Sequence, residues 1–497
     1  MKSNSRNLWF VWLALYAILS FFVGGRWNVP LAAWLAPVFA IRFYRESDRA
    51  WRGFFWLWLA SALPTILAWN GATALHQWHP AAEMIFFTLM TPIALVPYVV
   101  DRLFARRFSP SLWLTLVFPV AFTAVDFFAA TGSPFGSFGA GAYAQRDVIW
   151  LMQLAAVTGL WGIVFVSTWF ASVANHVWAQ GFQWRKVSRV VLVYAGALIL
   201  VVVFGFGRLL LAQPAAQTVP VAGFSLPAGQ VNALMMQVNS GDKDGFQAAT
   251  RTLHAQQIAQ IRMLAQSGAQ IVALQEGAGM GFTGDVDQLL ADTAAVAREE
   301  KIYIVLPTFA VDPAGQVQPE NVVRIIDPTG AVVLAHTKFG GTMFEGSVTG
   351  SGELQTVDTP FGRLSAVICW DADFPDVIRQ AGAQDVDLLF IPANDWHELR
   401  DIHAGMATFR AVENGTALFR QTGAGVSLVA DAYGRILNRV DGFAAENNDG
   451  FAATQQVETP IGSVDTVYPL VGDAFGWAMQ IGLVGLLGLL WIKRRPQ

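Results

Sequence analysis

Three side chains of this sequence, a cysteine, a glutamate and a lysine, have the chemistry that nucleophilic attack on a carbonyl needs. Cys369 is the single cysteine among 497 residues, so it has no partner for an intramolecular disulfide and is either a small buried hydrophobic residue or a reactive thiol. A carboxylate such as Glu276 can take the thiol proton and activate the nucleophile. An ammonium such as Lys338 can stabilise the oxyanion that forms when a thiolate attacks a carbonyl. We predict that Glu276, Lys338 and Cys369 are catalytic.

Each of the three residues ends an apolar run that is typical of a β-strand. Glu276 follows residues 270–274, Lys338 follows 331–335, and Cys369 closes 364–369. A sheet holds the backbone at such positions while the side chain faces a cleft. The sequence therefore predicts that the three side chains meet at strand ends.

A helix is predicted to begin directly after the cysteine. Asp373 is the expected N-cap, and Pro375 would lie in the first turn. Because the N-terminus of a helix favours negative charge, we expect it to stabilise the thiolate form of Cys369.

The segment around these residues, 213–473, reads as one globular domain of mixed type. Predicted strands cover 231–239, 270–276, 302–309, 321–327, 331–338, 362–369, 386–393, 416–422, 425–431 and 451–457. Predicted helices cover 246–266, 286–300, 375–382 and 399–414. Residues 327–330 and 431–434 have the composition of hairpin turns. Strands that partly alternate with helices predict a layered α/β domain with helices outside the sheets.

The remainder of the chain is too apolar for a soluble domain. The whole sequence is 54% hydrophobic and only 14% charged, against about 25% charged in soluble proteins. A membrane helix needs about 20 apolar residues. Seven spans are predicted in a membrane domain, 1–212, and an eighth in the C-terminal segment 474–497. They cover 8–25, 30–43, 51–69, 82–100, 111–130, 149–178, 187–212 and 474–492.

The basic residues between these spans predict the orientation, because loops rich in lysine and arginine stay in the cytoplasm. Fifteen fall on one side: Lys2, Arg6, Arg42, Arg45, Arg49, Arg52, Arg102, Arg106, Arg107, Arg185, Lys186, Arg189, Lys493, Arg494 and Arg495. Three fall on the other: Arg26, Arg146 and Arg208. Both termini and the basic tail are therefore expected in the cytoplasm, and the globular domain outside it. The net charge of −4 does not favour nucleic acid as a partner.

The catalytic segments resemble the nitrilase superfamily of carbon–nitrogen hydrolases. Its Glu, Lys and Cys motifs are similar to residues 274–276, 336–339 and 367–371, and two later motifs are similar to 394–396 and 409–415. The predicted eight-span frame, with residues 143–145, 153–155 and 468–473, resembles the membrane branch of that superfamily, the apolipoprotein N-acyltransferases. The resemblance implies an α-β-β-α sandwich domain and no cofactor.

The resemblance also implies a function and a location. The enzyme would move a phospholipid acyl chain through a cysteine thioester to the N-terminal diacylglyceryl-cysteine of a lipoprotein. It would act as a monomer in the bacterial inner membrane, with the catalytic domain facing outward. Substrate-binding or lid residues are expected at Glu345, Trp370, Asp371 and Asn394.

Several features leave other functions open. Gln275 stands where the branch usually has proline, the lid is reduced to 339–346, and Trp370-Asp371 matches soluble amidases equally well. A membrane-tethered amidase, or a binding or scaffold protein that retains the three residues, are the alternatives. No metal site is expected, since His397 and His403 are six residues apart and would not share one face of a helix.

Overall fold

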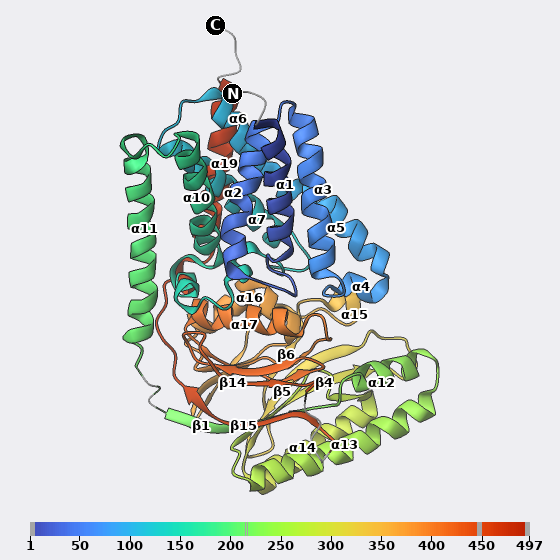
Figure 1. The fold of residues 1–497 in the computed structure, drawn as a ribbon. Coiled ribbons are helices and arrows are strands. Elements are labelled where there is room, and N and C mark those ends of the chain that lie inside the picture. The colour runs from blue at the N-terminus through green and yellow to red at the C-terminus, as the bar shows by residue number, and fades with distance from the viewer. Residues whose placement is uncertain (1–4, 214, 216, 445–449, 493–497) are drawn as a thin grey trace. The chain divides into compact units, whose positions relative to one another are not determined.

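The structure is a computed structural model that describes residues 5–213, 215, 217–444 and 450–492 (Figure 1). The chain divides into two compact units. The first comprises Met1–Ser133, Ser137–Leu211 and Val471–Gln497, and the second comprises Pro134–Gly136 and Ala212–Leu470. Each unit has its own hydrophobic core, so each is described separately.

The first unit is helical. Its helices are α1 (Ser5–Phe21), α2 (Pro30–Glu46), α3 (Ala50–Trp69), α4 (Ala74–Trp78), α5 (Pro80–Ala94), α6 (Val96–Arg107), η1 (Trp113–Leu116), α7 (Val117–Thr131), η2 (Gly141–Gln145), α8 (Ile149–Met152), α9 (Ala155–Thr158), α10 (Leu160–Ala179), α11 (Trp184–Leu210) and α19 (Ala474–Ile492). Their interior holds a few polar pairs. Arg45 binds both carboxylate oxygens of Asp101 at 2.6 and 2.8 Å, and the Trp161 indole donates to Asp473 at 2.8 Å.

Five helical segments among the described residues are long and apolar enough to cross a membrane. They are Pro80–Arg107, Trp113–Thr131, Leu160–Ala179, Trp184–Leu210 and Ala474–Ile492. The predicted span 149–178 is broken at Gly159, whose φ of +60° ends α9 before α10 begins. Helices α1 to α3 cover the three other predicted spans, and the count of eight crossings stays a prediction. Lys2 and Lys493, Arg494 and Arg495, used for the orientation, lie outside the described residues.

The second unit contains two large β-sheets. The seven-stranded sheet has the order β15-β1-β2-β4-β5-β6, with β3 paired to β4. Its strands are β1 (Gln217–Ser225), β2 (Ile271–Leu274), β3 (Gly279–Phe282), β4 (Tyr303–Val311), β5 (Glu320–Ile326), β6 (Val332–Thr337) and β15 (Ala452–Ile461). β1, β2 and β4 are parallel, and β5 and β6 continue the sheet in antiparallel pairing.

The six-stranded sheet has the order β14-β13-β11-β9-β8-β7. Its strands are β7 (Thr356–Thr359), β8 (Gly362–Ala366), β9 (Leu388–Phe390), β11 (Ala417–Arg420), β13 (Val426–Ala430) and β14 (Ile436–Asp441). A separate short pair joins β10 (Ala393–Asn394) to β12 (Thr422–Gly423). The predicted turns 327–330 and 431–434 connect β5 to β6 and β13 to β14, so both hairpins are confirmed.

The two sheets pack face to face, and helices cover their outer faces. Ile271 and Ala273 of β2 lie in the core between the sheets, whereas Val272 and Leu274 face the helices, as the period of two in a strand requires. α12 (Gln230–Asn239), α13 (Lys243–Gln266) and α14 (Thr283–Glu300) cover the first sheet, and α16 (Pro375–Ala383) and α17 (Arg400–Asn414) cover the second. Figure 1 shows α13 and α14 side by side in one layer and α16 and α17 in the other. The predicted α/β sandwich is confirmed.

One predicted strand is wrong. Residues 231–239 form helix α12, because Val231, Leu234, Met235 and Val238 share one helix face that packs on the core. The neighbouring strand β1 was missed, since Pro220 lies within it and proline argues against a strand in a sequence. The short or exposed strands β3, β7 and β14 were also missed.

Candidate active site

The three predicted catalytic residues come from both sheets of the second unit. Glu276 lies two residues after β2, and Lys338 directly follows β6, both in the seven-stranded sheet. Cys369 begins the short helix η3 (Cys369–Asp373) beyond β8 of the other sheet. The thiol therefore follows a strand of one sheet, and the two charged groups follow strands of the other.

Lys338 is buried between two carboxylates. Its ammonium is 1% exposed and donates to Glu276 Oε1 at 2.6 Å. It also pairs with Glu345, which lies on the one-turn helix α15 (Thr342–Glu345). Glu345, predicted as a lid or substrate residue, thus lies beside the lysine, with its side chain 28% exposed. The pairing fixes the lysine charge in a site that is mostly closed to water.

Two amide groups hold the Glu276 carboxylate from other directions. The Asn321 side chain on β5 (Glu320–Ile326) donates to Glu276 Oε1 at 2.8 Å and to Glu345 Oε2 at 3.2 Å. The backbone N–H of Asn394 donates to Glu276 Oε2 at 3.1 Å. Asn394 was predicted as a substrate residue, and its backbone has this positioning contact. Asn321 was missed, although a polar residue at the start of an apolar strand was visible in the sequence.

Burial and the nearby Glu276 carboxylate favour the protonated form of the Cys369 thiol. Burial, then the Glu276 carboxylate, raises the pKa of the Cys369 thiol well above its usual value, while Lys338 opposes this. Burial also lowers the Lys338 pKa, but the carboxylates of Glu276 and Glu345 outweigh it and hold that pKa well above the usual value. The expected thiolate at a helix N-terminus is thus wrong for the resting site. A base is required.

The turn that carries the cysteine is held in an unusual conformation. Cys369 has φ of +47°, in the left-handed region that residues with a side chain rarely adopt. Its N–H donates to the Pro392 carbonyl at 2.8 Å. The next helix, α16, has Phe374 rather than Asp373 at its N-cap, so the predicted cap is wrong. Cys369 is 7% exposed in this turn, and the charges of Glu276 and Lys338 act on its thiol.

Asp371 joins this turn to the strand end that carries the lysine. Its fully buried carboxylate accepts the N–H groups of Ile368 at 2.9 Å, Phe339 at 2.9 Å and Gly340 at 2.7 Å. It also contacts His336 Nε2 at 2.8 Å. These four contacts occupy the carboxylate. Asp371, predicted as a substrate or lid residue, has the geometry of a group that holds the turn of Cys369 against the segment that follows Lys338.

An aromatic stack lies over the turn. The ring of Trp370 stacks on Phe344 of α15, with centroids 5.3 Å apart and planes at 14°. Phe135, from the short segment Pro134–Gly136 that belongs to this unit, lies 5.3 Å from Phe344 and 5.8 Å from Trp370. The backbone of Gly341 approaches Trp370 so closely that an added Cβ would lie 2.2 Å from the indole. The predicted lid segment 339–346 thus packs against Trp370, the residue that follows Cys369.

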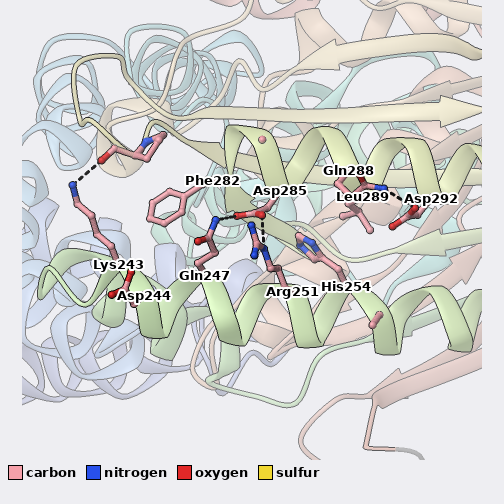
Figure 2. Close-up of a pocket in the computed structure, with 13 residues that line it drawn as sticks. Lys243, Asp244, Gln247, Arg251, His254, Phe282, Asp285, Gln288, Leu289 and Asp292 are labelled. Atoms are coloured by element: carbon pink, nitrogen blue, oxygen red, sulfur yellow. Dashed lines mark hydrogen bonds and ion pairs between the residues drawn. The ribbon is translucent and has the colours of Figure 1, made fainter.

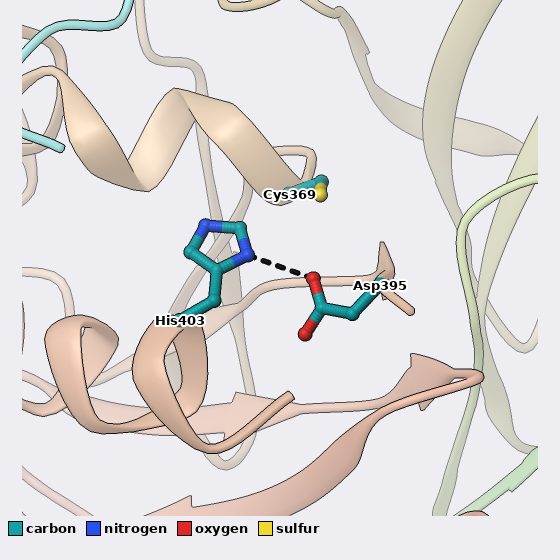
Figure 3. Close-up of side chains that lie close together, drawn as sticks. All are labelled: Cys369, Asp395 and His403. Atoms are coloured by element: carbon teal, nitrogen blue, oxygen red, sulfur yellow. Dashed lines mark hydrogen bonds and ion pairs between the residues drawn. The ribbon is translucent and has the colours of Figure 1, made fainter. Parts of the chain in front are cut away.

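Cys369 also has polar neighbours away from the triad. Its thiol and the side chains of Asp395 and His403 offer polar atoms within 4.8 Å of one another (Figure 3). Such a group could hold a metal ion by distance alone. However, Arg420 donates to both oxygens of Asp395, at 2.9 and 3.1 Å, and would face any cation placed there. The residues fit a charge network better than a metal centre.

A separate cleft lies between α13 and α14. Figure 2 shows Gln247 and Arg251 of α13 directed toward Asp285 of α14, at 2.7 Å each. His254 lines the same cleft and contacts the Met280 carbonyl through Nε2 at 2.9 Å. None of the predicted site residues lines it. The polar groups of the cleft pair with one another, which is typical of helix packing.

Known proteins match this chain over different parts of its length. A family model described as carbon-nitrogen hydrolase matches residues 233–457. An apolipoprotein N-acyltransferase of Geobacter metallireducens is 24% identical over 438 residues, covering 82% of this chain and 80% of that protein. One of Gloeobacter violaceus is 25% identical over an alignment of 518 positions, covering 97% and 89%. A solved amidase from Nesterenkonia sp. is 17% identical with a TM-score of 0.37, covering 53% of this chain and 96% of that chain. The similarity to these two acyltransferases extends over both units.

Proposed function

We propose that this chain moves an acyl chain from a phospholipid to the N-terminal amine of a lipoprotein through a thioester on Cys369. The proposal starts from the match of residues 233–457 to the carbon–nitrogen hydrolases and from the similarity of most of the chain to apolipoprotein N-acyltransferases. The observation that carries this proposal is a buried cysteine coupled to one carboxylate and one ammonium, in a chain similar to these enzymes over both units.

The first half-reaction forms the thioester. Glu276 takes the proton of the Cys369 thiol, and the thiolate attacks the ester carbonyl of the phospholipid. Lys338 stabilises the oxyanion. Collapse of this intermediate forms the C–S bond, breaks the C–O bond, and releases a lysophospholipid that takes the proton from Glu276.

The second half-reaction transfers the acyl group. The lipoprotein amine attacks the thioester carbonyl, and Glu276 accepts a proton from the nitrogen. The C–N bond forms, the C–S bond breaks, and the proton returns to the departing thiolate. The same carboxylate is used twice, which agrees with its firm placement by Lys338, Asn321 and the backbone of Asn394.

A trapping experiment tests the thioester. The purified full chain is mixed with phosphatidylethanolamine, and the intact mass is measured. We expect a gain of one acyl chain that hydroxylamine removes and that is absent from the C369A variant. Because the chain has a single cysteine, a hydroxylamine-sensitive adduct can be assigned to it directly. No adduct, together with turnover of small amides, would make the protein an amidase instead.

The outward orientation is part of the proposal and has its own test. A phosphatase reporter that works only outside the cytoplasm is fused after residue 460 or after residue 108. The excess of basic residues on one side predicts activity for the first fusion and none for the second. The opposite pattern would refute the orientation without touching the chemistry.

A further inference from the structure

A segment of four residues, 392–395, connects the nucleophile to its base. The Pro392 carbonyl accepts the N–H of Cys369 at 2.8 Å, and the N–H of Asn394 holds Glu276 Oε2 at 3.1 Å. Asp395 follows directly, and its side chain is fully buried. Whatever fixes Asp395 therefore fixes the separation between Cys369 and Glu276.

His403 of α17 contacts two acidic groups from opposite sides of its ring. Nδ1 lies 2.7 Å from Asp395 Oδ1, and Nε2 lies 3.3 Å from Asp373 Oδ2. Asp373 ends η3, the turn that Cys369 begins. The ring thus spans the gap between the turn of the nucleophile and the segment that holds the base. Its side chain is only 5% exposed.

The charges around the ring favour the imidazolium. Asp395 and Asp373 together outweigh both burial and Arg420, and they raise the pKa of His403 to about 9. Arg420, at the end of β11, lies 2.9 Å from Nδ1 and shares Asp395 with it.

The groups that face His403 are therefore Asp373 from η3, Asp395 beyond β10, Arg420 from β11, and Cys369 itself. The charged side chains of α16, Asp376 and Arg379, pair with each other at 3.9 Å, and β13 presents no charged side chain.

We propose that His403 is a positioning residue. As an imidazolium paired with Asp373 and Asp395, it holds Cys369 and Glu276 at a fixed separation and shields the thiol from the Asp395 charge. This rests on the proposed use of Cys369 as the nucleophile, but it does not depend on the acyl donor or acceptor. Burial and two nearby carboxylates already disfavour the thiolate, and removal of a positive charge within 4.8 Å would disfavour it further.

The test measures the reactivity of Cys369 rather than acyl transfer. The full chain, in lipid nanodiscs, is treated with iodoacetamide between pH 6 and pH 10, and the rate of cysteine modification is followed by mass spectrometry. H403N keeps a donor near the place of Nδ1, and H403Q keeps one near the place of Nε2, but both lose the charge. We expect each to raise the apparent pKa of the thiol by about one unit, so that modification at pH 7 slows about tenfold.

A second buried histidine of the same unit provides the matched control. His254 makes one contact, from Nε2 to the Met280 carbonyl, and the proposal predicts an unchanged pH profile for H254Q even if its unfolding temperature falls. A merely structural role for His403 would give the same pattern as H254Q. A wild-type profile in folded H403N or H403Q would overturn the proposal.

A third variant decides the matter if neither His403 substitution folds. D373N keeps the shape of the side chain and removes one of the two carboxylates that hold the imidazolium. The His403 pKa should then fall from about 9, and the pH profile of cysteine modification should change between pH 6.5 and pH 9. A D373N profile that coincides with the wild type would refute the proposal. Because these readouts need no acyl donor, they can fail while the thioester experiment succeeds.

Discussion

The substitution of Glu276 by glutamine isolates the function of this carboxylate as the base. The amide retains the shape of the side chain, and its oxygen can still accept hydrogen bonds from Lys338, Asn321 or the backbone of Asn394. It cannot accept the thiol proton. We therefore expect the site to remain assembled in E276Q while formation of the thioester nearly stops at neutral pH.

The size of the effect follows from the state of the thiol. A free cysteine with a pKa of about 8.5 is about 3% ionised at pH 7. Burial, the largest contribution in the wild-type site, raises the Cys369 pKa above its usual value and remains in the variant, so still less thiolate forms. General bases typically contribute 10²–10⁴-fold in rate. We expect acylation of E276Q at pH 7 to be slower by about 10²–10³-fold.

The pH dependence of acylation in E276Q follows from the change in the Cys369 pKa. Loss of the Glu276 charge lowers the Cys369 pKa somewhat, while burial still keeps it raised. Acylation of E276Q should therefore rise about tenfold per pH unit above pH 7 and remain incomplete at pH 8.5. The assay is the acyl-adduct mass measured against time, with E353Q as the control, since Glu353 is an exposed glutamate in the segment between β6 and β7. Wild-type acylation of E276Q at pH 7 would show that Glu276 is not the base, and Glu345, which shares Lys338 and Asn321 with it, would take its place.

Substitutions at Lys338, Gly341 and Asp371 test the rest of the site. K338A should slow thioester formation by roughly 10²–10³-fold. K338R should not restore the rate, because a longer planar group cannot place its charge between the same carboxylates. Recovery of the rate in K338R would argue against the need for a fixed point charge. G341A and G346A carry the same left-handed backbone penalty, at φ of +75° and +69°, but only G341A places a Cβ 2.2 Å from the Trp370 indole. Acylation should therefore fall in G341A alone. Equal acylation rates in the two variants would show that the aromatic stack does not contribute to catalysis. D371N replaces a carboxylate that accepts three backbone N–H groups by an amide that is partly a donor. It should lower the free energy of unfolding by about 1–3 kcal/mol and slow acylation. An unchanged midpoint of thermal denaturation would mean that these contacts contribute little to stability.

Much of the fold was predictable because its signals are local. The turns at 327–330 and 431–434 have the glycine and aspartate of hairpins, and the parallel strands β2 and β4 are short apolar runs next to amphipathic helices. The apolar runs near both ends of the chain predicted the long helices. Residues 231–239 were different, since a short apolar stretch fits either a strand or a helix, and packing against the neighbouring core decides between them.

The candidate site shows the same division. The sequence by itself predicted Glu276, Lys338 and Cys369 as catalytic residues, because each is a reactive residue at the end of an apolar run. Only the tertiary structure placed Asn321 between two carboxylates and enclosed His403 between Asp373 and Asp395, since these contacts join residues far apart in the chain. The tertiary structure also decided the resting charge of Cys369. A helix N-terminus is visible in a sequence, but the burial of the thiol and the charges that face it depend on the packing of the two sheets. Burial and the nearby carboxylates favour the protonated thiol.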